Sequence, residues 1–443
     1  MGAKGKSQEK KAEEAWQGLI TKYRISEEIE AYGQCEVSAE QMKEFREPRL
    51  MAKWDSEDVL PSVLKDRHWN ILPVSRSSYT VGDFKLYETL PPFLPARQSM
   101  KTMHFASSYE SIDLNQISSE ANAIHVLLLS DALDQFLEAE GTVETFNGRM
   151  GTGAFDFSVD SYSGHPRRVS VLGGGAQCEI DGGFENDESV IIMEAKNVLH
   201  PDFHVRQLYY PYRLWRNRVK KPIRLIFSQY YNRVFRLLEY GFTDAENYSS
   251  IKLLRQQSYS LDDTRITEAD LLRLWEETKP EYNDDYRVSS NPPFLQADKV
   301  ERVISLLEQL QQRSMTCAEI AQLMQFKERQ SNYYFNAGKY LGLFEKVETW
   351  KGKAVRLTKL GEHLNEMTYR ERQLKLAELM VKHTIFHRLF GKMADRRTIP
   401  SKEEIVEEML RLHVCSEKVA GRRSSTVTGW LQWIWNLKGD SNQ

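Results

Sequence analysis

AQCEIDGGFENDESVIIMEAKN (residues 176–197) carries the charged residues around which the rest of the chain is organised. It reads as two β-strands joined by a polar turn, and the apolar run over residues 190–193 is typical of a buried strand. Asp181 lies on the first strand, and Glu194 and Lys196 lie two apart on the second. Side chains alternate faces along a strand, so Glu194 and Lys196 share one face. Buried charges are costly unless they pair or hold a metal, so this trio indicates a functional site.

Length and composition predict a globular chain of several domains. With 443 residues, two to four domains are expected. The four cysteines form no CxxC pair, which argues against a zinc site and favours a reducing cytoplasm. No apolar run is long enough to cross a bilayer, and the charged start is unlike a signal peptide, so we expect a cytoplasmic protein without membrane contact. The net charge is −3, so any nucleic-acid binding must come from local basic surfaces.

The pattern around residues 176–197 predicts an α/β core, a mixed sheet flanked by helices. One helix, over residues 118–139, precedes this stretch and is capped by a serine at its start. A basic amphipathic helix follows it, and two more strands are predicted over residues 222–232 and 234–242. The polar residues 243–295 are expected to end the core.

Residues 298–363 predict a winged helix, because a helix, a capped helix, a turn, a third helix and a hairpin follow in order. The first residues of such a third helix reach base edges in the major groove, and Gln, Asn and Arg are suited to base contacts. The predicted DNA-binding residues here are Arg329, Gln330, Ser331, Asn332 and Tyr333. The alternative is a winged helix that binds protein.

Helical patterns continue to the C-terminus. Helices are predicted over residues 371–389 and 401–412, and a final helix is predicted to start near Ser424. This pattern could be a second, incomplete helix-turn-helix. Its basic, hydroxyl-rich start, with Arg422, Arg423 and Ser424, suits phosphate contacts.

Four domains are therefore expected. They are an N-terminal helical and mixed region that could contact DNA (1–95), the α/β core (96–295), the winged helix (296–370) and a C-terminal helical domain (371–443). The C-terminal domain is either a second winged helix or a helical domain of another kind.

The charged trio has the chemistry needed to cleave a phosphodiester. Mg²⁺ prefers hard oxygen ligands and few protein carboxylates. Asp181 and Glu194 supply carboxylates, and the Ala195 carbonyl is a neutral third ligand. Lys196 is able either to orient or deprotonate the attacking water or to hold the phosphate. Burial lowers an ammonium pKa and carboxylates raise it, so both roles stay open.

Other residues have two readings each. Glu120, in the first turn of the predicted helix, either complements the helix dipole or is a further catalytic acid. Gln207 either contacts the catalytic water or a phosphate, or is simply solvated. The basic cluster of Arg46, Arg49 and Lys53 is a solvated face unless it lies beside a nuclease core, where it would contact phosphates.

Asp181, twelve intervening residues and then EAK (194–196) at a strand end resemble the PD-(D/E)XK nuclease superfamily. With the flanking helices, residues 100–245 resemble type II restriction endonucleases. The resemblance implies Mg²⁺-dependent, sequence-specific cleavage of double-stranded DNA. Two departures matter: Ile180 stands where the motif's proline would be, and Glu179, on the same face as Asp181, leaves the identity of the first carboxylate open.

A restriction enzyme has further expected partners. Two nicks in duplex DNA need two active sites, so a homodimer is expected. A cognate DNA methyltransferase would protect the host's own sites. The alternatives are a DNA-repair or mobile-element nuclease with structural preference, and a non-catalytic winged-helix regulator that binds DNA.

Overall fold

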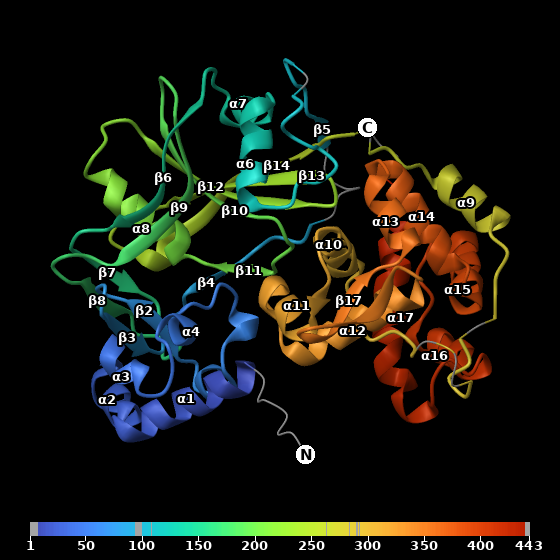
Figure 1. Cartoon of the computed structure of the whole chain (residues 1–443), viewed down its shortest axis with the longest axis horizontal. Helices are drawn as coiled ribbons and strands as arrows, with labels where there is room; N and C mark the ends of the chain where they lie inside the picture. The colour runs from blue at the N-terminus through green and yellow to red at the C-terminus, as the bar shows by residue number, and fades with distance from the viewer. Residues whose placement is uncertain are drawn as a thin grey trace.

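The computed structural model describes residues 8–93, 100–107, 109–262, 264–282, 284–288, 291 and 293–438. It is a mixed α/β structure in which the N-terminal segment (blue) lies beneath a central sheet (green) and the C-terminal helices (orange and red) lie to one side (Figure 1). Residues 1–7, 94–99, 108, 263, 283, 289–290, 292 and 439–443 of the predicted domains lie outside the described residues. In the part of the chain that is described, no helix is long and apolar enough to cross a membrane.

The N-terminal segment (residues 8–82) packs helices on a three-stranded sheet of order β1-β3-β2. Its elements are α1 (Gln8–Lys22), α2 (Ile25–Tyr32), β1 (Gln34–Ser38), α3 (Ala39–Lys43), α4 (Arg49–Ala52), η1 (Glu57–Val59), α5 (Ser62–Lys65), β2 (Asn70–Pro73) and β3 (Ser78–Gly82). Trp16 and Val81 are fully buried in its core. A capping box begins α3, because Ser38 and Gln41 each accept a hydrogen bond from the other's backbone.

The central sheet has seven strands in the order β5-β14-β13-β12-β10-β9-β6. The elements of this region are β4 (Tyr87–Thr89), β5 (Met100–Thr102), α6 (Glu120–Leu129), α7 (Ala132–Leu137), β6 (Val143–Gly151), β7 (Phe155–Val159), β8 (Arg167–Val171), β9 (Gln177–Glu185), β10 (Val190–Lys196), β11 (Asp202–His204), α8 (Arg206–Arg216), β12 (Ile223–Tyr231), β13 (Val234–Phe242), η3 (Tyr248–Ser250), β14 (Ile251–Ser260) and α9 (Glu268–Glu277). Strand β10 pairs antiparallel with β9 and parallel with β12, so the sheet is mixed as predicted.

Helices α6 and α8 cover opposite faces of strand β10. Ile191 and Met193 pack in one apolar cluster with Ile124 of α6. Ile192 packs in another with Leu208 of α8. Because successive side chains of a strand point to opposite faces, Glu194 follows Ile192 toward α8.

Two predictions for this region are wrong. The predicted helix over residues 118–139 is two helices, because Ser130 takes an extended conformation and pairs with Phe105. The sequence predicts no strand within residues 243–295, but β14 joins the sheet beside β13; alternate residues over 252–256 are exposed, so no continuous buried apolar run marked this strand.

Residues 300–357, the helix–hairpin unit, have the predicted order of helices and hairpin. The elements are α10 (Val300–Leu310), β15 (Met315–Thr316), α11 (Cys317–Met324), α12 (Glu328–Tyr340), β16 (Phe344–Thr349) and β17 (Gly352–Leu357). The capping box predicted at the start of α11 is present between Thr316 and Glu319. Partial burial opposes ionisation of Glu319, but the Thr316 backbone, Lys351 and Arg313 all donate to its carboxylate and lower its pKa to about 2.

The chain ends in five helices. They are α13 (Lys359–Glu366), α14 (Tyr369–Val381), α15 (Thr384–Arg396), α16 (Lys402–Arg411) and α17 (Glu417–Trp435). The predicted helix over residues 371–389 is interrupted at His383, which is extended and hydrogen-bonds Asp284. Helix α17 starts at Glu417 rather than near Ser424, because its first turns also bury apolar side chains such as Ala420. Within residues 358–438 the structure has no strand, so no hairpin completes a second winged helix there.

Candidate active site

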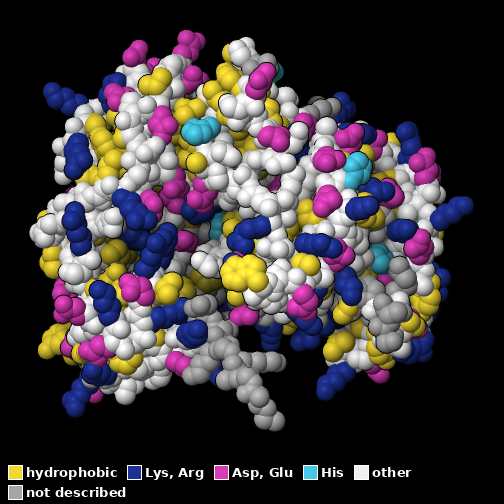
Figure 2. Space-filling model, in the orientation of Figure 1, with side chains coloured by type: hydrophobic (Ala, Val, Ile, Leu, Met, Phe, Trp, Pro, Cys, Tyr) yellow, Lys and Arg dark blue, Asp and Glu magenta, His cyan; other side chains and the backbone are white. Residues whose placement is uncertain are grey.

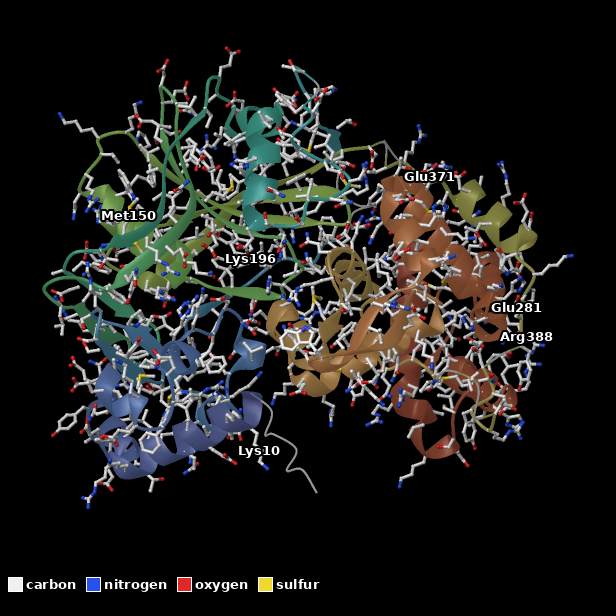
Figure 3. The ribbon with its side chains drawn as sticks, in the orientation of Figure 1. Lys10, Met150, Lys196, Glu281, Glu371 and Arg388 are labelled. Carbon is white, nitrogen blue, oxygen red and sulfur yellow. The ribbon has the colours of Figure 1, made fainter. Side chains whose placement is uncertain are left out.

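A cleft of about 460 Å³ opens between the central sheet and the N-terminal segment. Acidic and basic side chains gather side by side in this region of the surface (Figure 2), and Lys196 lies where the sheet faces the N-terminal segment (Figure 3). The charged residues that line the cleft are Arg49, Lys53, Asp55, Arg76, Glu120, Arg149, Glu179, Asp181, Glu194, Lys196 and Arg206. The predicted trio therefore shares one cleft with Glu120, Gln207 and part of the N-terminal basic cluster.

Asp181 is held against strand β10. Its Oδ2 accepts a hydrogen bond of 3.0 Å from the Ala195 backbone N–H, across the β9–β10 pair. Glu179 also lines the cleft but is half exposed, and its Oε1 lies 3.3 Å from the Arg149 guanidinium. Of the two carboxylates that the sequence left open, Asp181 is the one fixed beside Glu194.

Glu194 is the buried centre of the trio, with 5% of its surface exposed. Its Oε1 accepts a hydrogen bond of 2.5 Å from Lys196 Nζ, which also donates to the Ala195 carbonyl at 3.2 Å. The Gln207 amide, from the first turn of α8, donates to the same Oε1. Gln207 is therefore directly bound to the trio and is not a solvated residue.

Glu120 reaches the cleft from the other face of the sheet. Ser119 caps α6, as predicted, so Glu120 is the first residue of this helix. Its Oε1 lies 3.5 Å from Lys196 Nζ. Glu120 is thus positioned to act both at the helix N-terminus and on the trio.

Burial and mutual repulsion shift the ionisation of these groups. Burial, reinforced by Asp181, raises the pKa of Glu194 to about 8 despite the nearby Lys196. Burial also raises the pKa of Glu120. For Lys196, burial acts downward, but Glu194, Glu120 and Asp181 outweigh it and the pKa is raised. The ammonium form of Lys196 is therefore favoured at neutral pH, which suits a group that holds a phosphate.

The donor set fits Mg²⁺ by its chemistry. Asp181 and Glu194 line the cleft with carboxylate oxygens, the ligand type that Mg²⁺ prefers, and the Ala195 carbonyl, which accepts a hydrogen bond from Lys196 Nζ, adds a neutral oxygen beside them. Gln207 adds an amide oxygen that is buried and accepts no hydrogen bond. Among the described residues, no three His, Cys, Asp or Glu side chains form a metal-binding cluster, so the set depends on two carboxylates and neutral oxygens.

Sequence reasoning missed four charged residues of the cleft. Asp55, Arg76, Arg149 and Arg206 all line it. Asp55 lies just beyond the basic cluster at 46–53, and that proximity was the only signal available for it. Arg206 is the first residue of α8, directly before Gln207.

Two predicted DNA-binding residues at the start of α12 have structural roles. Ser331 is fully buried and donates to the Cys317 carbonyl at 2.7 Å. Gln330 caps its own helix by accepting a hydrogen bond of 3.0 Å from the Lys327 backbone. The prediction is wrong for Ser331, because helical phase turns its side chain toward α11 and away from any ligand.

The remaining residues of that set are accessible. Arg329 and Asn332 are exposed, and the Arg329 guanidinium lies 5.6 Å from the centroid of the half-buried Tyr333 ring. Trp350, at the tip of the β16–β17 hairpin, is 91% exposed.

The segment with Arg422, Arg423 and Ser424 lies inside α17 and not at a helix start. Ser424 is buried, and Arg423 donates to the carbonyls of Phe294 and Leu295. Only Arg422 of the three is exposed. The predicted phosphate site at a helix N-terminus is therefore absent from this segment.

The fold and cleft define a mixed α/β protein with a buried carboxylate–lysine site and a C-terminal helical region. Three family models match the chain in turn, each described as a domain of unknown function: DUF6996 over residues 13–81, DUF6997 over 82–260 and DUF7226 over 302–439. The cleft is lined by residues from the first two of these segments. No curated protein and no solved structure matches the chain.

Proposed function

We propose that this protein is a Mg²⁺-dependent endonuclease of the PD-(D/E)XK type that cuts double-stranded DNA at specific sites, as type II restriction endonucleases do. The observation that carries the proposal is the convergence of Asp181, Glu194 and Lys196 at the floor of one cleft. Glu194 is buried on the strand that carries the lysine, and the half-buried Asp181 is hydrogen-bonded to the backbone of that strand; this arrangement supports a metal site more strongly than a surface salt bridge.

Each residue has a role in this proposal. Asp181, Glu194 and the Ala195 carbonyl would hold Mg²⁺, which supplies Lewis-acid activation of water and phosphate when bound. Lys196, kept as an ammonium by its carboxylate neighbours, binds a non-bridging oxygen of the scissile phosphate and stabilises its developing charge. Gln207 holds the Glu194 carboxylate in place through its amide hydrogen bond.

Recognition is assigned to the helix–hairpin unit, as a winged helix. Arg329 and Asn332 on α12 are exposed and of the types suited to bidentate base contacts. The β16–β17 hairpin would be the wing.

We further propose that the protein acts as a cytoplasmic homodimer on DNA, because two nicks in a duplex need two active sites. A cognate methyltransferase would act beside it. A repair or mobile-element nuclease is the second candidate, favoured by the depth of Lys196, which lies at the cleft floor with 11% of its side chain exposed.

The test is plasmid and genomic DNA cleavage by the full chain with Mg²⁺ or EDTA. Lys196→Met removes the cleft ammonium, and Lys220→Met, at an exposed position just beyond α8, is its matched control. Discrete fragments from the wild type and Lys220→Met, lost in EDTA and in Lys196→Met, support restriction-type cleavage. Diffuse degradation favours the repair nuclease. DNA binding without cleavage of any DNA refutes the nuclease and leaves the non-catalytic regulator.

A further inference from the structure

The cleft has two walls that are bonded to each other. Tyr210 of α8 donates to the Pro73 carbonyl at 2.9 Å. The Leu172 backbone donates to the Val74 carbonyl at 2.8 Å. Val74 and Tyr210 also belong to one buried apolar cluster, to which both the N-terminal segment and the core contribute. Widening the cleft would break these contacts, so the walls define its working width.

Several cations that line the cleft lack an anionic partner. Among the described residues, Arg49, Lys53, Arg76 and Arg206 form no ion pair, whereas Arg149 is paired with Glu179. The Nε of Arg206 is buried and has no hydrogen-bond partner. Arg49, Lys53 and Arg76 come from the N-terminal wall and Arg206 from the α8 wall. Unpaired cations on both walls of a cleft whose floor is acidic are suited to a ligand with several phosphates.

The size of the cleft limits what enters it. About 460 Å³ lies within the range of sites for small ligands, roughly 300–1,000 Å³. Lys196 lies at its floor with only 11% of its side chain exposed. A scissile phosphate must therefore pass between the two walls to reach Lys196, and a single strand does so more readily than a duplex, whose major groove alone is about 12 Å wide. Tyr79 on the N-terminal wall adds an aromatic side chain, and an aromatic beside cations is the combination found in single-strand grooves.

We infer that the cleft takes one DNA strand separated from its complement, with the phosphates next to the scissile one held by Arg49, Lys53 and Arg76 on one wall and Arg206 on the other. This inference rests on the proposed nuclease function and names its immediate substrate. Recognition on the duplex by the helix–hairpin unit is compatible with it, provided that the base pairs at the cut are open when the strand enters.

The experiment compares three labelled oligonucleotide substrates of one sequence: fully paired, paired with a central mismatched bubble, and single-stranded. With full-length protein and Mg²⁺, the bubble and the single strand should be cut at least about tenfold faster than the paired duplex, which is about 1.4 kcal/mol in barrier. The cuts in the bubble substrate should fall within its unpaired part.

A second measurement tests the phosphate contacts. Single-strand affinity falls with salt by a logarithmic slope of about 0.7 per phosphate contact. Arg76→Ala and Arg206→Ala should each lower that slope by about 0.7, whereas Arg168→Ala, at an exposed position outside the cleft, should leave it unchanged. Equal or faster cutting of the paired duplex, or unchanged slopes in both cleft variants, would overturn the inference and leave the nuclease proposal standing. Failure to cut all three substrates would instead overturn the nuclease proposal.

Discussion

Gln309→Ala tests whether the helix–hairpin unit positions Lys196, the lysine of the proposed active site. Gln309 of α10 is buried, and its amide donates to the Asn197 carbonyl at 3.0 Å. Asn197 directly follows Lys196, and its side chain donates to the Ser118 carbonyl at 2.9 Å, two residues before Glu120. Gln309 therefore fixes Asn197, which connects the strand end at Lys196 to the start of the helix that carries Glu120.

The expected magnitude follows from the lost hydrogen bond. Removing the donor leaves the partly buried Asn197 carbonyl unpaired, at a cost of about 1–3 kcal/mol. Each 1.4 kcal/mol is about tenfold in rate. If the lost hydrogen bond shifts the segment that follows Lys196, the lysine is displaced and the barrier to cleavage rises by a similar energy. The cleavage rate at saturating DNA should then fall by about tenfold to a hundredfold, with DNA affinity unchanged.

The assay is single-turnover cleavage combined with a DNA-binding titration. Gln312→Ala, at an exposed position three residues further on, is the matched control and should cut at the wild-type rate. Thermal unfolding of both variants shows whether the fold is intact. Wild-type cleavage by Gln309→Ala, or a loss of activity fully explained by weaker DNA binding, would refute the positioning role.

Three further outcomes are expected. Mg²⁺ should raise the unfolding temperature of the wild type, because a ligand that binds only the folded state stabilises that state. Asp181→Asn should abolish this increase. An equal increase in both proteins would contradict the metal site. Glu319→Gln should cost about 1 kcal/mol at neutral pH, because the amide keeps the capping box but loses the ion pairs with Arg313 and Lys351. Because the folded pKa of Glu319 is depressed to about 2, its contribution is present above the ordinary value of 4.5 and is lost as the pH falls toward 2, so unfolding of the two proteins should converge in acid. Arg329→Ala should weaken DNA binding at an unchanged unfolding temperature. Ser331→Ala loses a buried hydrogen bond and should lower the unfolding temperature by an amount equivalent to about 1–2 kcal/mol. The reverse pattern would exclude α12 as the DNA-recognition helix.

Local signals in the sequence predicted local structure well. The strand pair around Asp181 and Glu194 is formed as expected, because alternation and an apolar run are properties of the strands themselves. The capping boxes beginning at Ser38, Thr316 and Ser401 also form, because each needs only residues three apart. The sequence left Gln207 open between a role at the site and simple solvation, and the contact with Glu194 became visible only in the structure.

Tertiary contacts account for the errors. His383 interrupts a continuous helical pattern because its ring stacks on Tyr340, 3.7 Å between centroids, and hydrogen-bonds Asp284, and both partners are distant in sequence. Ser331 was predicted to contact DNA because it lies in the first turn of the helix expected to enter the groove. Its position along the helix did not reveal that its side chain points into the protein, where it is fully buried. Arg76 lies more than a hundred residues from the trio in the chain, and no short-range pattern relates the two.

The charge balance of the cleft links its two functional features. The trio and its neighbours place Asp55, Glu120, Asp181 and Glu194 around the single ammonium of Lys196. Concentrated negative charge is costly to bury, and the raised pKa values of Glu120 and Glu194 reflect this cost. A divalent cation at the floor would offset the excess there, while the unpaired cations on the walls would remain available for phosphates. The acidic floor and the basic walls are therefore complementary parts of one site. A bound metal would neutralise the carboxylates of the floor, and a bound polyanion would neutralise the cations of the walls.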